Sequence, residues 1–317
     1  MASAMMLGMT SGMTVGMTVG MNEAGAAIAF VAPSGFLPDP STIDRSARFF
    51  TRRGWRVQSG DSCFERHLRF AGPDELRCTE LQRFATDRNV DVVMAARGGY
   101  GLTRFLDRLD FAAIRRAERF IVGYSDFTAF NLALLAQAGG ASWQGPSSLD
   151  FAAESPDEYT VGHFFGVLQG GRHTVEFAAE GSPDCEARGT LWGGNLALVC
   201  ALLGTPYMPR SRGILFLEDV NEPAYCIERM LLQLLQAGVL ARQRAVLLGA
   251  FAPVPPQAND NGFDLAQVVA HLRAVGTTPI VSGLPFGHVP RKATVPVGKA
   301  ARLAVAGGRA RLEFHGA

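Results

Sequence analysis

Short runs of apolar residues alternate with helical segments in the first half of the chain, and this pattern restricts the fold more than any other feature. The expected strands are 27–31, 55–57, 90–95 and 119–122, and the expected helices are 42–53, 74–87 and 127–138. Continuously apolar strands, each followed by a helix, are typical of a parallel sheet covered on both faces. We therefore predict an α/β region with a doubly wound parallel sheet.

The second half of the chain is richer in short strands. Strands are expected at 213–217, 245–251, 279–281, 293–295, 301–305 and 310–314, with helices near 195–203 and 223–237. A polar stretch that ends in two glycines separates this half from the first. We predict an α/β domain at 23–155, a linker or crossover at 156–172, and a β-rich α+β domain at 173–317.

Residues 1–22 differ from the rest of the chain because they contain seven of its ten methionines and a repeated Met-Thr-Val-Gly. No Lys or Arg precedes Arg45, so the positively charged part of a secretory signal is missing. We expect a disordered N-terminal extension at 1–22.

The charge balance excludes several classes of partner. Thirty basic and 29 acidic residues leave a net charge of +1, too little to attract nucleic acid or an anionic membrane surface. No stretch of about 18 apolar residues is present, so no spanning helix is expected. The five cysteines are scattered and odd in number, which predicts reduced thiols and neither a metal site nor a disulfide framework. We expect no cofactor.

The loop 123–128 joins an expected buried strand to an expected helix. Ser125 in this loop would sit on a sharp turn at the carboxyl end of the sheet, with free helix N–H groups behind it for a developing oxyanion. Phe127 departs from the Gly-x-Ser-x-Gly motif of α/β-hydrolases. Ser125 is therefore a candidate nucleophile, and a simple helix cap by Ser125 or Asp126 is the alternative.

A second loop, Arg97-Gly98-Gly99-Tyr100-Gly101, follows the expected strand 90–95. Its glycines permit positive φ and close approach of the backbone to a ligand. The spacing matches neither a dinucleotide-binding nor a P-loop motif, so a phosphate-binding loop and a plain glycine turn both remain open.

Two further candidates come from separate elements of the second half. Glu218 ends the expected strand 213–217, and His288 lies in a loop rich in glycine and proline. His288 could take a proton from Ser125 while Glu218 holds the imidazole tautomer. An ordinary exposed histidine is the alternative for His288, and Asp219 and Glu222 are rival carboxylates.

Taken together with their surroundings, these segments resemble the LD-carboxypeptidases, the muramoyltetrapeptide carboxypeptidases of peptidoglycan recycling. The resemblance runs in order from about residue 27 to residue 305. The matching segments are RFAG (69–72), RGGYG (97–101), SDFT (125–128), GTLWGGNL (189–196), GTP (204–206), LED (217–219) with Glu222 and ERML (228–231), GLPFGH (283–288) and TVPVG (294–298).

The resemblance implies a serine peptidase with the triad Ser125, His288 and Glu218. It implies an oxyanion hole made by the backbone amides of Asp126 and of Gly98 or Gly99. It further implies cleavage of the bond between an L-centre of a diamino acid, usually meso-diaminopimelate, and the terminal D-Ala of a murein tetrapeptide. A cytoplasmic homodimer with the active site between two domains is expected on the same ground. Tyr124 before the nucleophile and the extension 1–22 depart from the typical pattern.

Arg97 and Tyr100 are candidates for substrate contacts. The guanidinium of Arg97 could bind the terminal carboxylate of a peptide, or it could brace the glycine loop. Two other functions remain possible from the sequence. One is the related self-immunity peptidase group, which cleaves peptidyl-aminoacyl-adenylate antibiotics. The other is a non-catalytic α/β protein that binds a small ligand at the loop 97–101.

Overall fold

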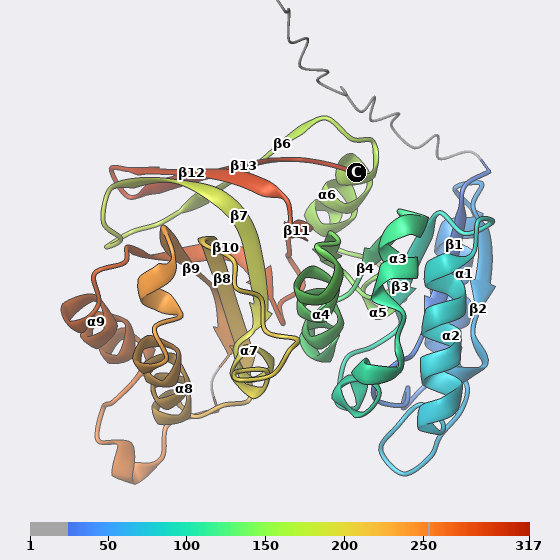
Figure 1. Cartoon of the computed structure of the whole chain (residues 1–317), viewed down its shortest axis with the longest axis horizontal. Helices are drawn as coiled ribbons and strands as arrows, with labels where there is room; N and C mark the ends of the chain where they lie inside the picture. Colours follow the sequence, from blue (N-terminus) through green and yellow to red (C-terminus); the bar gives the residue numbers. More distant parts are fainter. Residues whose placement is uncertain (1–24, 253) are drawn as a thin grey trace, which may run out of the picture.

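The computed structural model describes residues 25–252 and 254–317, which form two sheets in two lobes (Figure 1). The expected extension 1–22 lies outside the described residues. The first part of the chain contains β1 (Ala27–Val31), α1 (Ser41–Thr51), β2 (Arg56–Ser59), α2 (Asp74–Thr86), β3 (Val92–Ala95), α3 (Phe111–Ala117), β4 (Phe120–Val122), α4 (Thr128–Ala138), β5 (Ser142–Gln144), α5 (Ser148–Phe151) and α6 (Glu158–Leu168).

The first sheet is six-stranded, with the order β11-β5-β4-β3-β1-β2. The strands β1 to β5 pair in parallel, and β1 and β3 are completely buried. The chain leaves β1 for β2 on one side and then returns to β3 on the other. This reversal creates a topological switch point between β1 and β3, where open α/β sheets bind their ligands beyond the carboxyl ends of the strands.

The second part of the chain builds a seven-stranded sheet with the order β10-β9-β8-β7-β12-β13-β6. Its elements are β6 (Arg172–Ala178), β7 (Cys185–Asn195), α7 (Leu196–Ala201), β8 (Gly213–Val220), α8 (Ala224–Gln236), β9 (Ala245–Ala252), α9 (Leu265–Val275), β10 (Ile280–Gly287), β11 (Val295–Val297), β12 (Ala300–Ala306) and β13 (Arg309–His315). The strands β7 to β10 are parallel, whereas β7, β12, β13 and β6 are antiparallel neighbours. The predicted fold class, a parallel N-terminal sheet followed by a sheet-rich second region, is confirmed.

The strand β7 has no counterpart among the predicted elements, although it lies at the centre of the second sheet. Glycines interrupt its apolar pattern, and Gly193 is in a left-handed conformation with φ +137°. A Cβ on Gly193 would lie 1.9 Å from the carbonyl oxygen of Phe216 on β8. Gly193 therefore permits a close approach between the backbones of β7 and β8. A search for apolar strand patterns does not detect such a position.

The strand β11 joins the two sheets. It follows the second-half strand β10 in the chain, yet it pairs antiparallel with β5 in the first sheet, with Val295 opposite Gln144. Only two residues separate β11 from β12 of the second sheet, and the amide of one of them, Gly298, donates to the carbonyl of Leu191 on β7. Helix α6 occupies most of the expected linker 156–172. The domain boundaries stay a prediction. The first sheet nevertheless includes β11, which belongs to the part of the chain assigned to the second domain.

No helix among residues 25–252 and 254–317 is long and apolar enough to cross a membrane.

Helix α6 contains a histidine whose burial makes folding depend on pH. The Nδ1 atom of His163 accepts a hydrogen bond from the amide of Thr294, next to β11, at 3.1 Å. Burial, with a smaller contribution from His173, lowers the pKa of His163 to about 4 from 6.5. The unfolded chain therefore takes up this proton at a higher pH than the folded chain does, and the folded state loses stability as the pH falls from about 6.5 to about 4.

We expect this loss to reach about 3 kcal/mol in the free energy of unfolding at the acid end of that window. Urea unfolding at several pH values measures it. In His163→Gln, whose side-chain oxygen can still accept from Thr294, this part of the pH dependence should vanish. An unchanged pH dependence in that variant would show that other groups cause it.

Candidate active site

Ser125 lies on a strained turn at the carboxyl end of the first sheet. It begins the 3₁₀ turn η4 (Ser125–Phe127), which connects β4 to α4, and its φ is +63°. A left-handed conformation is unfavourable for a residue with a side chain, and such strain is concentrated at functional turns. The turn presents a serine where the first N–H groups of a helix have no partner within the helix.

The glycine loop after β3 lies against this turn. A Cβ on Gly98 would lie 2.5 Å from the Cβ and 2.7 Å from the Oγ of Ser125, and 3.4 Å from the amide nitrogen of Asp126. Gly99 is left-handed, with φ +110°, and lies against the backbone of Gly35 after β1. The amide of Gly35 donates to the carbonyl of Gly98 at 3.1 Å. The loops after β1, β3 and β4 therefore meet at the switch point.

His288 and Glu218 form the second part of the site. The Nδ1 atom of His288, just after β10, lies 2.8 Å from Oε2 of Glu218 on β8. The Glu218 side chain is completely buried, whereas 21% of the His288 side chain is exposed. A carboxylate on Nδ1 fixes the tautomer in which Nε2 is free to accept a proton.

Tyr124 connects the two parts of the site. It directly precedes Ser125, and its ring packs on the imidazole of His288 with centroids 5.0 Å apart. Burial, and then the nearby Asp150 and Glu218, raise the pKa of Tyr124, so the phenol is neutral at physiological pH. The contact places the serine turn beside the histidine. An imidazole–carboxylate pair beside a serine can activate the hydroxyl as a nucleophile.

An ion pair with a buried lysine fixes the loop that carries His288. The ammonium group of Lys292 pairs with Asp150 of α5 and lies 4.8 Å from the ring centroid of Tyr124. The amide of Lys292 donates to Oγ1 of Thr160 on α6, and that hydroxyl donates to the carbonyl of Pro290. Nothing in the sequence pattern predicted Lys292 or Asp150, because the two residues are 142 positions apart.

Asn195 links the sheets behind the site. It ends β7 opposite Glu218 of β8, and its Nδ2 atom donates to Oδ1 of Asp219 at 2.9 Å and to Oε1 of Glu218 at 3.4 Å. Its amide donates to Oγ1 of Thr128, the first residue of α4. Asp219, a rival carboxylate in the sequence, accepts from the amide of Ala197 in α7 and so anchors that helix. In the sequence, Asn195 belongs to the matching segment GTLWGGNL (189–196), but no role was assigned to it; in the structure it is the N-cap of α7.

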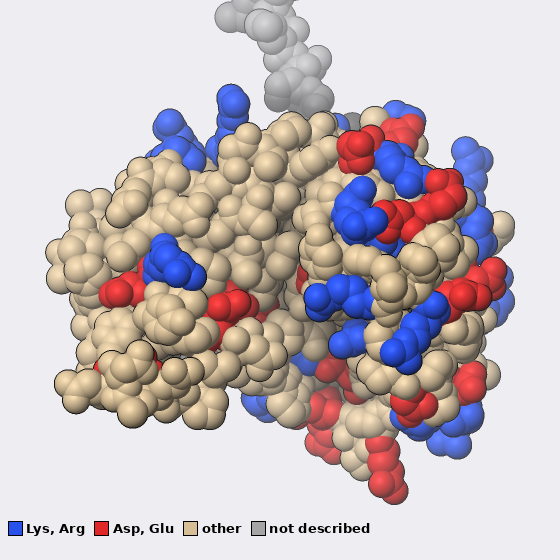
Figure 2. All heavy atoms as spheres, turned by 90° about the horizontal axis from the view of Figure 1, so that it is seen from below, with Lys and Arg blue, Asp and Glu red and all other residues tan. Residues whose placement is uncertain are grey.

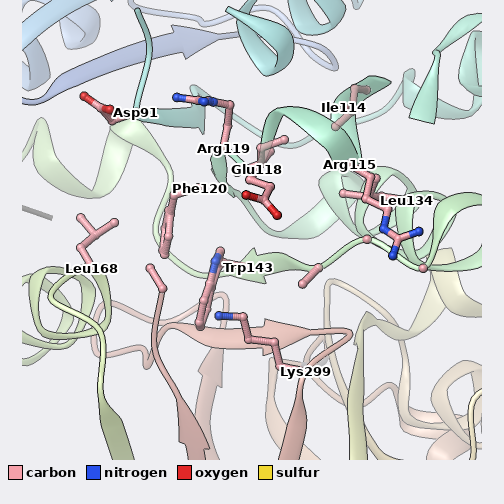
Figure 3. A pocket seen from close by; sticks show the side chains of 15 residues that line it. Asp91, Ile114, Arg115, Glu118, Arg119, Phe120, Leu134, Trp143, Leu168 and Lys299 are labelled. Atoms are coloured by element: carbon pink, nitrogen blue, oxygen red, sulfur yellow. The ribbon is translucent and has the colours of Figure 1, made fainter. Parts of the chain in front are cut away.

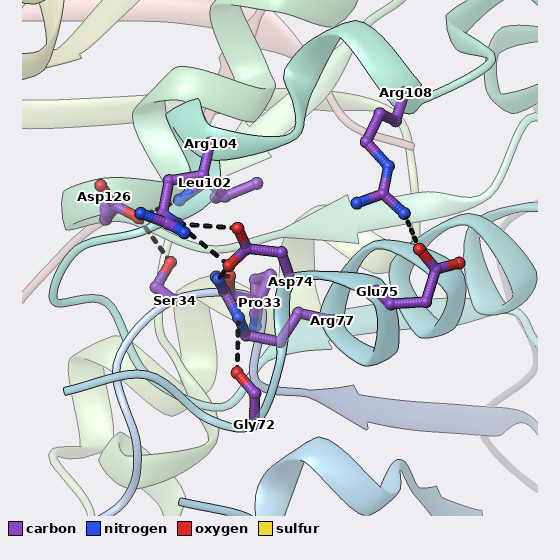
Figure 4. A network of polar contacts seen from close by, with 10 residues as sticks. All are labelled: Pro33, Ser34, Gly72, Asp74, Glu75, Arg77, Leu102, Arg104, Arg108 and Asp126. Carbon is purple, nitrogen blue, oxygen red and sulfur yellow. Dashed lines mark hydrogen bonds and ion pairs between the residues drawn. The ribbon is translucent and has the colours of Figure 1, made fainter. Parts of the chain in front are cut away.

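A polar network supports the loops on the other side of Ser125 (Figure 4). The Asp126 carboxylate accepts hydrogen bonds from Oγ of Ser34 at 2.6 Å and from the amide of Leu102 at 3.0 Å. Burial raises the pKa of this carboxyl group. The completely buried Arg77 donates to the carbonyls of Pro33 and Gly72 and pairs with Asp74. These bonds connect the loops after β1, β3 and β4.

The two predicted substrate contacts lie on the glycine loop in different settings. The guanidinium of Arg97 donates to the carbonyl of Phe36, the contact expected if it braces the loop. Tyr100 is 43% exposed and packs against Phe70. A substrate role for either residue stays a prediction. The rival carboxylate Glu222 lies beyond β8 in the turn before α8.

A cavity of about 650 Å³ lies elsewhere, where the first sheet meets the C-terminal part of the chain (Figure 3). Asp91, Phe120 and Trp143 line it at the amino ends of β3, β4 and β5. Lys299 also lines it, with Nζ 4.7 Å from the ring centroid of Trp143 and donating to the carbonyl of Gly316. Because Ser125 follows the carboxyl end of β4, the cavity belongs to the opposite edge of the sheet.

The described residues contain no group of three or more His, Cys, Asp or Glu side chains that could hold a metal ion. All five cysteines are free thiols.

Comparison with known proteins agrees with the motifs. A profile of the LD-carboxypeptidase N-terminal domain matches residues 28–145, and a profile of the LD-carboxypeptidase C-terminal domain matches residues 188–303. A relative from Bacillus subtilis (strain 168), described as a probable murein peptide carboxypeptidase, is 31% identical over 286 residues. The alignment covers 88% of this chain and 89% of the relative.

Solved structures share the fold. The crystal structure of a muramoyltetrapeptide carboxypeptidase from Oxalobacter formigenes superposes with a TM-score of 0.86 at 40% identity, over 91% of this chain and 98% of that one. The wild-type microcin C7 self immunity protein MccF superposes with a TM-score of 0.80 at 21% identity, over 93% of this chain and 97% of that one. At that identity MccF shows the fold alone. By its sequence profiles and its relatives, the chain belongs to the LD-carboxypeptidase family.

Proposed function

We propose that the protein is a serine LD-carboxypeptidase that releases the terminal D-Ala from the murein tetrapeptide L-Ala-D-Glu-meso-diaminopimelate-D-Ala in peptidoglycan recycling. The observation that carries the proposal is the 2.8 Å contact between His288 and the buried Glu218, beside the strained turn of Ser125. The murein peptide substrates named for the relative and for the solved structure support the choice of substrate.

The reaction begins with attack of the Ser125 hydroxyl on the carbonyl of the L,D-peptide bond. Nε2 of His288 accepts the hydroxyl proton, while Glu218 on Nδ1 stabilises the imidazolium that forms. Collapse of the tetrahedral intermediate breaks the C–N bond, and His288 gives its proton to the leaving amine of D-Ala. Water then attacks the acyl-enzyme by the same route, which releases the tripeptide and restores the serine.

The oxyanion would be bound by the backbone amides of Asp126 and of Gly98 or Gly99. Gly98 lies against both Ser125 and the Asp126 amide, so the two loops approach the position where a carbonyl bonded to Oγ would lie. Each such donor typically contributes about 3 kcal/mol to transition-state binding. The function needs no metal or cofactor.

Glu218→Gln should lower kcat by about 10²- to 10⁴-fold and leave KM within about threefold, because the amide no longer holds the imidazole in its productive tautomer. Glu222→Gln is the matched control, since it neutralises the nearby rival carboxylate. Steady-state kinetics of D-Ala release measure both. Equal kcat values for Glu218→Gln and the wild type would exclude Glu218 from the triad.

The substrate is tested by mass spectrometry of a digest of the synthetic tetrapeptide. We expect a tripeptide and free D-Ala as the only products. A wild-type protein with a native circular dichroism spectrum that leaves the tetrapeptide intact would contradict the proposal.

A self-immunity peptidase is the second candidate, favoured by the similarity of the fold to MccF. The wild-type protein should be offered a peptidyl-aminoacyl adenylate in parallel with the tetrapeptide. Preferential cleavage of the adenylate would reverse our choice.

A non-catalytic protein would leave Ser125 unlabelled by a fluorophosphonate probe.

A cytoplasmic homodimer completes the proposal. The five free thiols suit a reducing compartment. Light scattering of the purified protein should give twice the mass of the 33.9 kDa chain.

A further inference from the structure

Two arginines lie at the edge of the candidate active site and are not used by the mechanism above. Arg66 and Arg69 are exposed residues of the loop before α2. The guanidinium carbon of Arg66 lies 4.2 Å from the ring centroid of Phe36, and that of Arg69 lies 5.6 Å from the ring centroid of Tyr100. Stacking on an aromatic face restricts the orientation of a guanidinium.

Backbone contacts fix this loop relative to Ser125. The amide of Phe36 donates to the carbonyl of Arg69 at 3.3 Å, and Gly35 forms an antiparallel bridge with Phe70. Gly35 in turn donates to Gly98, which lies against Ser125. The ring of Phe70 in the arginine loop also packs on the ring of Tyr100 in the glycine loop, with centroids 5.8 Å apart, so the two loops are in contact.

Neither arginine has an acidic partner. No carboxylate among residues 25–252 and 254–317 forms an ion pair with Arg66 or Arg69. The arginines next to them differ, because Arg77 and Arg104 pair with Asp74 and Arg97 binds a carbonyl. In the view of Figure 2, basic and acidic side chains are interspersed over the first lobe.

We propose that Arg66 and Arg69, together with the exposed ring of Tyr100, form a subsite for a free carboxylate on the acyl part of the substrate. The inference rests on the proposed function and specifies its substrate as a stem peptide with free, not amidated, side carboxylates. A planar guanidinium with several N–H donors suits a carboxylate, and an amide in its place loses the charge.

The place of the arginines relative to Ser125 decides which carboxylate binds there. The terminal carboxylate of D-Ala is only a few ångströms from the bond that is cut, so it must be bound close to Ser125. Among the described residues, Arg66 and Arg69 are connected to Ser125 only through the loop after β1 and the glycine loop, so their subsite fits the more distant carboxylates of D-Glu or of the diaminopimelate side chain. These groups remain in the tripeptide product.

The test compares three tetrapeptides: the free acid, the peptide amidated at D-Glu, and the peptide amidated at diaminopimelate. For the wild type, kcat/KM should be about tenfold higher for the free acid than for at least one amidated peptide. In the double variant Arg66→Gln/Arg69→Gln the preference should fall to no more than about twofold. The change should appear in KM and leave kcat unaltered, because the arginines bind the substrate away from the reacting atoms.

Arg53→Gln is the control. Arg53 is exposed and lies 3.7 Å from the ring centroid of Phe49, but it follows α1 beside Gly54, at the amino edge of the sheet. It should keep the wild-type preference. The inference is overturned if the double variant lowers kcat/KM equally for all three peptides, or if the wild type has no preference.

Binding to Ser125→Ala by titration calorimetry separates this inference from the proposed function. If the wild type releases no D-Ala, the proposed function fails. The arginine subsite is still supported if Ser125→Ala binds the free acid about tenfold more tightly and the added arginine changes remove the difference. Equal affinities would reject the subsite.

Discussion

Ser125→Ala is expected to abolish release of D-Ala from the tetrapeptide while the fold is retained. Loss of a serine nucleophile typically lowers kcat by about 10⁶-fold, and only binding and oxyanion contacts remain. The substitution removes one hydroxyl and changes no backbone bond of the turn. Mass spectrometry of the digest measures the activity, and circular dichroism verifies the fold. Normal turnover by this variant would refute the whole mechanism.

Ser125→Gly makes the same experiment sharper. The φ of +63° at this position is unfavourable for alanine as well as for serine but not for glycine. We expect both variants to be inactive, with Ser125→Gly more stable to urea than Ser125→Ala by about 1 kcal/mol. Equal stabilities would mean that the strained turn relaxes when the hydroxyl is removed.

Gly98→Ala is expected to have the second-largest effect. The new Cβ would lie 2.5 Å from the Cβ and 2.7 Å from the Oγ of Ser125, closer than carbon atoms approach without a shift. Either the serine turn or the glycine loop must move, and the oxyanion donors lose their alignment. We expect kcat/KM for the tetrapeptide to fall by at least about 10²- to 10³-fold, the loss typical of one oxyanion donor.

Gly162→Ala is the matched control for this change. Gly162 lies in α6, with no atom within 4 Å of its added Cβ, so the substitution should stabilise the helix by about 1 kcal/mol and leave kcat/KM unaltered. Near-normal activity of Gly98→Ala would show that catalysis does not depend on the close approach of the two loops.

Much of the first sheet could be predicted because its strands are apolar along their whole length. The strand β1 lies at the expected residues 27–31, and α2 begins at the expected Asp74. Local patterns also identified the serine turn and the glycine loop. They ended the strands of Glu218 and His288 too early, at residues 217 and 281, whereas β8 runs to Val220 and β10 to Gly287. Family resemblance, and not spacing, assigned Glu218 rather than Asp219 to His288.

Contacts between distant segments could not be predicted in this way. The pair of Lys292 and Asp150 and the placement of β11 beside β5 depend on tertiary packing and not on any local period. Helix α6 has a polar start, with an Asp157 cap, and was interpreted as a linker for that reason. Arg66 and Arg69 lie in an irregular loop, which has no periodic pattern. The sequence therefore did not predict that their guanidinium groups stack on the rings of Phe36 and Tyr100.

The pairing of β11 with β5 restricts how a peptide can reach the site. Enzymes with two lobes often admit their substrates by hinged rotation of one lobe away from the other. Here such a rotation would pull Val295 away from Gln144, and only two residues separate β11 from β12 to absorb the movement. The entrance should therefore keep a nearly constant width through the catalytic cycle, and the choice among peptides would depend on the loops around it.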